Sequence, residues 1–189
     1  MFKARSIASH SKRRRGFTLI ETALATVIVG VGIVAMMQLF AACTFETRAS
    51  AQMSTATLLA SNIQEAMGGL TFADPSVGHT HFGKETGETL ATFNDIDDFD
   101  AGSFNPPIDS LRQQIPTMSK YTQVVSVWPV YPYNLSSNNS EVLPGSPIKA
   151  ANYPTYTGAV RVRVRIMYAA NPTDVASEIY QASWIRMDN

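Results

Sequence analysis

Cysteine and histidine are scarce in this sequence, which excludes several classes of functional site. The 189 residues contain one cysteine, Cys43, so neither an internal disulfide nor a multi-cysteine zinc site can form. Three histidines are present, and the pair His79 and His81 has no clear third metal ligand. We find no Ser/His/Asp or Cys/His constellation in a plausible context and no glycine-rich phosphate loop, and therefore expect no enzymatic activity.

Positive charge is concentrated in the first 16 residues and scarce elsewhere. Residues 1–16 contain six of the 15 lysines and arginines and no acidic residue. The remaining chain has nine basic residues against 15 acidic ones, a formal charge of −6. Such a charge argues against nucleic-acid binding, which normally needs a basic patch. A basic segment before an apolar one also favours a cytoplasmic N-terminus, with the bulk of the protein outside the inner membrane.

The apolar segment over residues 17–42 is long enough to cross a membrane. Of these 26 residues, only Glu21 normally carries a charge. As a helix the segment would be roughly 39 Å long, against a hydrocarbon core of about 30 Å. A carboxylate in hydrocarbon costs at least a few kcal/mol, so Glu21 needs a partner and is a candidate functional residue. Cleavage after Gly16 would supply one, because the new α-amine of Phe17 is cationic near neutral pH.

The residues around this cleavage point carry a resemblance to a known family. A basic leader, Gly16 and the run Phe17-Thr18-Leu19-Ile20-Glu21 before an unbroken apolar helix resemble the prepilin signature of type IV pilins and type II secretion pseudopilins. The resemblance covers residues 1 to about 45. It implies that prepilin peptidase cleaves between Gly16 and Phe17, that Phe17 is N-methylated, and that Glu21 docks each subunit through the amine of a neighbour.

The same resemblance implies a location and a set of partners. The subunit would be stored in the inner membrane with one span, its N-terminus cytoplasmic and its C-terminal domain periplasmic, before it enters a pilus or pseudopilus fibre. Its partners would be other pilin or pseudopilin subunits, the prepilin peptidase, the inner-membrane assembly platform and the lipid bilayer. It would be a substrate of the peptidase and methyltransferase.

Other interpretations of the N-terminal region stay open. One is an ordinary signal anchor with a stray glutamate. Another is a lipid-anchored exported binding protein, because Phe40-Ala41-Ala42-Cys43 resembles a lipoprotein cleavage box with Cys43 as the anchor. Against the second, the apolar run is about twice the usual signal length, and Glu21 would be unexplained.

The choice between a minor and a major fibre subunit rests on two features. Many major pilins close a C-terminal loop with a disulfide, and the lone Cys43 departs from that pattern. The run Thr22-Ala23-Leu24-Ala25 resembles minor pilins and minor pseudopilins. A minor tip or priming subunit is therefore favoured over the major subunit, and the choice between a pilus and a secretion system stays open.

The whole chain predicts an α+β fold in which a long N-terminal helix packs on a small antiparallel sheet. An apolar stripe at helical spacing continues the helix after the membrane segment, and Gly68-Gly69 predicts its end. The stripe comprises Ala49, Met53, Ala56, Ala60, Ile63 and Met67. The predicted domains are a cleaved leader (1–16), a transmembrane or fibre-core helix (17–44), its amphipathic second half (45–68) and a periplasmic domain (69–189).

The periplasmic domain is predicted to contain a three-stranded antiparallel sheet with long loops. The strands are expected at residues 121–130, 159–168 and 178–187, the last two joined as a hairpin, and residues 70–119 are expected to be irregular. Alternation in the second strand predicts a buried face and a wet face. The wet face would carry Arg161, Arg163 and Arg165, which we expect to pair with Glu178 or with the acidic loop at 95–100.

That acidic loop is the weak candidate for a metal site. Four carboxylates in six residues could bind Ca²⁺, which prefers oxygen ligands. They are Asp95, Asp97, Asp98 and Asp100. Their spacing does not match an EF-hand, and the calcium loop of some major pseudopilins has no match here. We therefore expect a solvated acidic loop and no cofactor, with calcium as the alternative.

Overall fold

The computed structural model describes residues 16–74, 82–130 and 158–188. In these residues it has one long helix, two 3₁₀ turns and four strands, so the predicted α+β fold is confirmed. The chain divides into two compact units, residues 1–48 and 49–189, and the long helix belongs to both. The elements are α1 (Leu19–Gly68), η1 (Asp97–Phe99), β1 (Gly102–Phe104), η2 (Pro116–Met118), β2 (Tyr121–Pro129), β3 (Ala159–Tyr168) and β4 (Ser177–Met187).

The first unit is the N-terminal part of α1. Every residue from 16 to 51 is exposed, and the apolar residues lie on all sides of the helix. Threonine hydroxyl groups in this segment bond back to the helix: those of Thr22 and Thr26 donate to the carbonyls of Leu19 and Thr22, at 2.9 and 2.8 Å. By length and composition α1 can cross a membrane.

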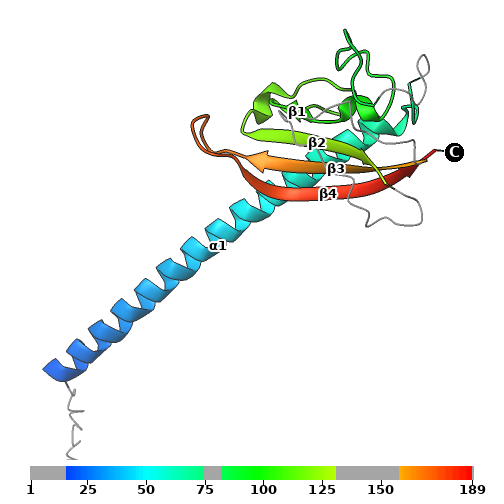
Figure 1. Ribbon diagram of the computed structural model, residues 1–189. Helices are drawn as coiled ribbons and strands as arrows, with labels where there is room; N and C mark the ends of the chain where they lie inside the picture. The colour runs from blue at the N-terminus through cyan, green and yellow to red at the C-terminus, as the bar shows by residue number, and fades with distance from the viewer. Residues whose placement is uncertain (1–15, 75–81, 131–157, 189) are drawn as a thin grey trace, which may run out of the picture. The chain divides into compact units, whose positions relative to one another are not determined.

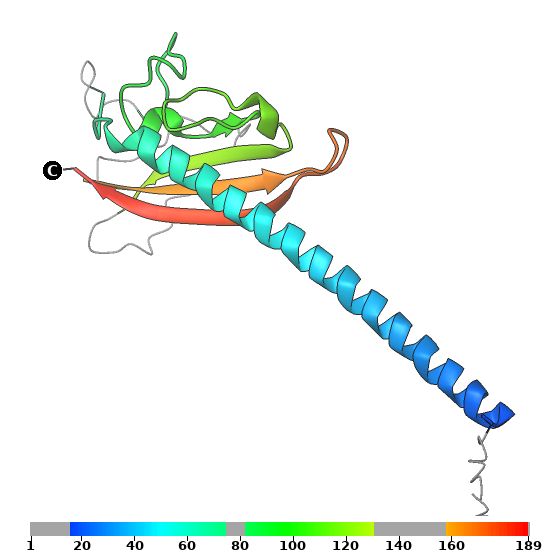
Figure 2. The same ribbon diagram turned by 180° about the vertical axis from the view of Figure 1, so that it is seen from behind.

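The last turns of α1 belong to the second unit and lie across one face of the sheet (Figures 1 and 2). Their buried residues recur every three or four positions and share one hydrophobic core with residues of the strands. These residues are Ala56, Leu59, Ala60, Ile63, Ala66 and Met67. The predicted stripe is thus confirmed from Ala56 onward. Ala49 and Met53 are exposed, a correction, because the core that covers the stripe begins only at Ala56.

The sheet has the order β1-β2-β3-β4, and all neighbouring strands are antiparallel. Register fixes which side chains meet α1: Val127 lies opposite Val162, and Val162 lies opposite Trp184. The three predicted strands and the hairpin are confirmed. The sheet is not three-stranded, however, since β1 lies within the predicted irregular region. Three residues are too few for a periodic pattern, and β1 forms only by pairing with β2.

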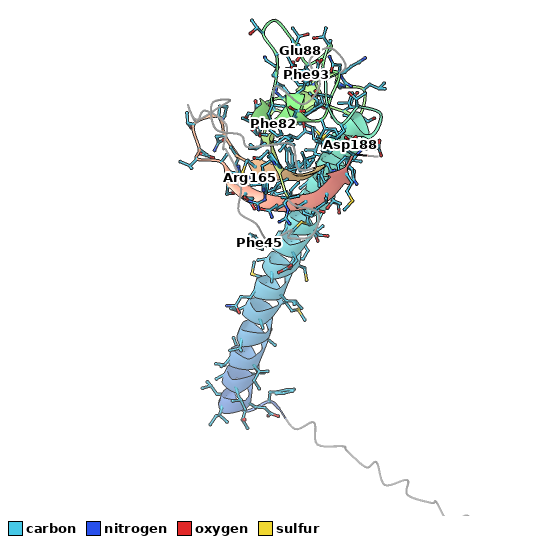
Figure 3. The ribbon with its side chains drawn as sticks, turned by 45° about the vertical axis from the view of Figure 1, so that its right-hand side comes forward. Phe45, Phe82, Glu88, Phe93, Arg165 and Asp188 are labelled. Atoms are coloured by element: carbon cyan, nitrogen blue, oxygen red, sulfur yellow. The ribbon has the colours of Figure 1, made fainter. Side chains whose placement is uncertain are left out.

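The face of the sheet that carries the arginines of β3 is less exposed to solvent than the sequence predicted. Arg161, Arg163 and Arg165 (the last labelled in Figure 3) are half-buried, and Trp128 on the neighbouring strand is buried. The guanidinium carbon of Arg163 lies 5.0 Å from the centre of the Trp128 ring, a cation–π contact. Within the described part of the chain, Glu178 is exposed and forms no ion pair, so the expected pairing with Glu178 is wrong.

A buried glutamine joins the helix, the sheet and the segment between them. Gln123 on β2 is fully buried. Its Nε2 donates to the carbonyl oxygens of Leu59 on α1 and Ile108, both at 2.9 Å, and its Oε1 accepts from the backbone N–H of Ile108 at 2.7 Å. Because a buried amide is costly unless its hydrogen bonds are made, these contacts fix how the three segments pack.

We predict that Gln123→Leu destabilises the protein by about 2–4 kcal/mol. The change leaves the buried N–H of Ile108 without an acceptor and removes two further hydrogen bonds. Chemical denaturation of the full chain in detergent measures this. The matched control is Gln181→Leu on β4, where the side chain is exposed, and it should change stability by less than about 0.5 kcal/mol. Equal effects of the two changes would contradict the role given to Gln123.

Candidate functional site

The predicted cleavage point lies immediately before α1. Gly16 and Phe17 are both exposed and not helical, with 77% of the Phe17 surface accessible. A Cβ atom added at Gly16 would meet no other atom within 4 Å. The described residues therefore leave room for a side chain at this exposed position, and we expect any need for glycine to come from a binding partner. Residues 1–15, which complete the leader, lie outside the described residues.

Glu21 lies in the first turn of α1, where the helix begins. Its backbone N–H donates to the Thr18 hydroxyl at 3.3 Å, so Thr18 caps the helix with the Thr-x-x-Glu spacing of a capping box. The side chain of Glu21 is exposed, and it forms no ion pair with any residue that the structure describes. The helix N-terminus favours a carboxylate here, and that carboxylate stays accessible to a cation from outside the segment.

Cys43 lies inside α1 and is an exposed free thiol. The helix continues without interruption from Leu19 through Cys43 to Gly68. Cleavage before Cys43, as a lipid anchor would need, would divide this helix and remove its whole apolar first part together with Glu21.

The acidic loop at 95–100 is buried, which corrects the expectation of a solvated loop. The relative exposures of Asp95, Asp97, Asp98 and Asp100 are between 2% and 6%. Ile96 and Phe99 explain this burial. Both are core side chains, three residues apart, and their packing carries the aspartates between and beside them inward. The ring of Phe99 packs edge-on against Phe93, with centroids 5.1 Å apart.

Backbone N–H groups satisfy these buried carboxylates one by one. Asp97 accepts from Gly83 at 2.7 Å, and Asp100 accepts from Val127 on β2 at 2.9 Å. Asp95 accepts from the N–H of Asp98 at 3.1 Å, and Asp98 accepts from the N–H of Asn94 at 2.8 Å. The described aspartates of the loop do not converge as a group of metal ligands. Their common role is to hold an irregular segment onto the core.

Burial changes the ionisation of this loop. Desolvation, reinforced by the charges of Asp97 and Asp98, raises the pKa of Asp95 to about 8. Desolvation also raises the pKa of Asp97 and of Asp98 above its ordinary value. The raised pKa favours the protonated form of Asp95, which can share a hydrogen bond with the side chain of Asp97 and so relieve their repulsion.

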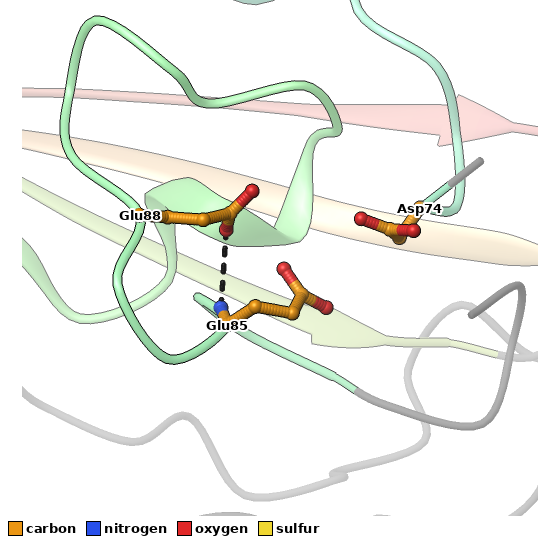
Figure 4. A group of neighbouring side chains, drawn as sticks. All are labelled: Asp74, Glu85 and Glu88. Atoms are coloured by element: carbon orange, nitrogen blue, oxygen red, sulfur yellow. Dashed lines mark hydrogen bonds between the residues drawn. The ribbon is translucent and has the colours of Figure 1, made fainter. Parts of the chain in front are cut away.

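A second acidic group, which the sequence analysis missed, lies beside the loop. Asp74, Glu85 and Glu88 each place a carboxylate oxygen within 4.8 Å of the others (Figure 4). The three residues belong to the segment between α1 and β1, where Figure 3 labels Glu88.

Local backbone pairing brings the three acidic residues together. Thr71 forms an isolated parallel bridge with Asp95, and its carbonyl accepts from Ile96 N–H at 3.2 Å, which holds residues 71–74 beside the acidic loop. A tight turn places Glu88 over Glu85, whose N–H donates to Glu88 Oε2 at 3.1 Å. Gly87 in this turn has φ +97°, a conformation that favours glycine. Gly87 was the one visible sign of this turn in the sequence.

The predicted histidine pair, His79 and His81, lies outside the described residues. The two groups of functional candidates are thus separate in the chain: Gly16, Phe17 and Glu21 at the start of α1, and the carboxylates between α1 and β1.

Comparison with known protein families gives one match. Residues 11–37 match the model of a prokaryotic N-terminal methylation motif. The matched stretch contains the predicted cleavage point, the capped helix start with Glu21, and most of the exposed apolar segment. Neither a curated protein nor a solved structure matches the chain significantly.

Proposed function

We propose that this chain, which carries the N-terminal methylation signature of type IV pilins and type II secretion pseudopilins, is a structural subunit of a pilus or pseudopilus fibre. The motif over residues 11–37 is the observation that carries the proposal. In this proposal prepilin peptidase cuts after Gly16, Phe17 is N-methylated, and the subunit acts as a minor, tip or priming component. The lone Cys43 supports the minor role, because it excludes an internal disulfide.

The exposed part of α1 supports storage in a bilayer followed by assembly. Fifteen large apolar side chains from Phe17 to Phe45 are each more than half exposed. Before assembly, we place this segment in the inner membrane, with the leader in the cytoplasm and residues 69–189 in the periplasm. After assembly, the same side chains would pack against the helices of neighbouring subunits.

Glu21 supplies the contact that decides docking in this proposal. Moving an apolar helix from lipid into a fibre exchanges one apolar surrounding for another, so hydrophobic burial contributes little. A polar contact in a medium of low dielectric constant contributes far more. The exposed carboxylate of Glu21 and the amine that cleavage creates on a neighbour's Phe17 would form such a contact.

The first prediction concerns processing. Expressed with an active prepilin peptidase and methyltransferase, the chain should lose its first 16 residues and carry a monomethylated Phe17, as read by mass spectrometry. Gly16→Trp should stay full-length, because the peptidase would reject a bulky side chain at this position, where the described residues leave space for a Cβ atom. Gly32→Leu, another glycine with open surroundings, is the matched control and should be cut normally. A diacylated Cys43 at the N-terminus would instead establish the lipid-anchored alternative.

The second prediction concerns assembly. Glu21→Val should insert and be cleaved normally, yet its share in sheared fibres should fall at least about tenfold, because removing one partner of a buried ion pair costs about 3–5 kcal/mol. The control is Glu46→Val, which removes an exposed carboxylate from α1 beyond the apolar segment. Quantitative immunoblotting of fibre and membrane fractions compares the two. Normal incorporation of Glu21→Val would rule out docking through this carboxylate.

A further inference from the structure

Strand β4 is a long edge strand of the sheet. In the order β1-β2-β3-β4 it pairs with β3 on one side, and Figures 1 and 2 show it along one edge of the described sheet. The strand at the other edge, β1, has three residues, whereas β4 has 11. Because a short edge strand offers little backbone for pairing, β4 is the edge that can accept a further strand.

Few of the features that protect an edge strand from pairing are present in β4. Residues 177–187 contain no proline and no glycine, and the only charged side chains, Glu178 and Arg186, lie near the two ends. A β-bulge interrupts the register near the start of the strand, and from Tyr180 to Met187 the pairing with β3 is continuous. The stretch 179–185 is uncharged and rich in isoleucine and aromatic residues, which favour strand pairing.

The alternation of hydrogen bonds identifies the open backbone groups of β4. The N–H of Asp188 donates to the carbonyl of Gly158 at 3.1 Å, which makes these two residues a hydrogen-bonded pair. Bonded and non-bonded pairs alternate along antiparallel strands, so the next non-bonded residues of β4 direct their N–H and C=O groups away from β3. These residues include Gln181, Ser183 and Ile185. No described residue bonds to their outward groups, which therefore form an open row of donors and acceptors.

On the face of the sheet toward α1, the apolar side chains of β4 are only partly covered. Tyr180, Ala182 and Trp184 pack against the core and are half-buried. A hollow of about 280 Å³ lies between β4 and the end of α1, with Trp184 and Met67 in its lining. A strand added beside β4 would place alternate side chains about 4.5–5.5 Å from those of β4 on this face. Apolar side chains there would pack on the exposed parts of Tyr180 and Trp184.

On the other face of the sheet, the charge beside β4 is positive. Arg165 lies opposite Gln181, and it forms no hydrogen bond or ion pair with any described residue. The side chain is half-buried, and its Nε is buried without a hydrogen-bond partner. An acidic residue opposite Gln181 on an added strand would lie two strand spacings, about 9.6 Å, from the backbone of Arg165. An arginine and a glutamate side chain together span that distance, so this face selects an acidic partner.

We propose that the outer edge of β4 binds an extended strand of another protein, with apolar side chains toward α1 and acidic side chains toward the arginines of β3. The backbone groups of the edge supply hydrogen bonds to any extended chain, and the two faces select among sequences. An acidic side chain of the added strand pairs with Arg165. This surface is separate from the apolar first part of α1, and the proposal does not depend on the chain's role in a fibre.

Hydrogen exchange of single amides, followed by NMR on the full chain in detergent, tests whether a strand is added. The probe is a synthetic peptide of alternating valine and glutamate, as long as β4. It should slow exchange of the N–H groups of Gln181, Ser183 and Ile185 at least about tenfold, because each gains an acceptor. The N–H groups of Ala182 and Trp184, already bonded to β3, should change little. Unchanged exchange at all three outward amides in millimolar peptide would overturn the proposal.

Fluorescence anisotropy of labelled peptides tests the selection by charge. A peptide of alternating valine and lysine should bind at least about tenfold more weakly than the valine–glutamate peptide, because like charges then face each other. Arg165→Gln should reduce this preference at least about threefold. The control is Arg48→Gln, which removes an exposed arginine from α1 and should leave the preference unchanged. Equal binding of the two peptides by the unchanged chain would rule out an acidic partner strand.

Two substitutions at one exposed position of β4 locate the binding edge. Ser183→Pro removes an outward N–H and leaves the hydrogen bonds to β3 in place, so it should weaken binding of the valine–glutamate peptide at least about tenfold. Ser183→Ala is the matched control and should bind normally. Equal binding by the two variants would refute the edge as the site. Sedimentation of the chain alone covers the other occupant: a dimer that Ser183→Pro dissociates would assign the edge to a second copy and overturn the acidic partner.

Discussion

The helix α1 has to satisfy two different surroundings with one continuous backbone, and the rest of the structure follows from that constraint. In its first part, apolar side chains lie all around the helix, and threonine hydroxyls bond back to the preceding turn. An isolated helix of this kind needs an apolar surrounding on every side. From Ala56 the pattern narrows to one buried stripe, and the surrounding is then the sheet. The change of pattern, rather than a break in the helix, separates the two roles.

Polar groups make the packing of the second unit specific. Apolar residues of α1 and the sheet provide the burial, but a valine surface and an alanine stripe would tolerate several registers. Gln123 excludes most of them, since its amide must reach Leu59 on α1 and both backbone groups of Ile108 at once. Asp97 and Asp100 do the same for the segment between α1 and β1, each by accepting from one distant backbone N–H. Irregular backbone is thereby held where no regular strand or helix could hold it.

Patterns local in sequence were predictable, and contacts between distant segments were not. The helix followed from an apolar run and a stripe, and β2, β3 and β4 followed from alternation and β-branched content. Strand β1 is too short for either signal. The burial of Asp95, Asp97, Asp98 and Asp100 reverses what their charge suggests, because Ile96 and Phe99 determine the position of the loop. Asp74 comes beside Glu85 and Glu88 through contacts between distant segments, namely the bridge of Thr71 to Asp95 and the hydrogen bonds of the Asn94 amide, which no spacing rule encodes.

The difference between local sequence patterns and contacts between distant segments also separates the two candidate functional regions. Gly16, Phe17 and Glu21 need only a capped helix start and an apolar run, so a short motif over residues 11–37 describes them completely. Among the residues that the structure describes, their hydrogen bonds stay within the first turns of α1. The second unit is therefore free to differ in fold detail and in ligand without disturbing the N-terminal chemistry.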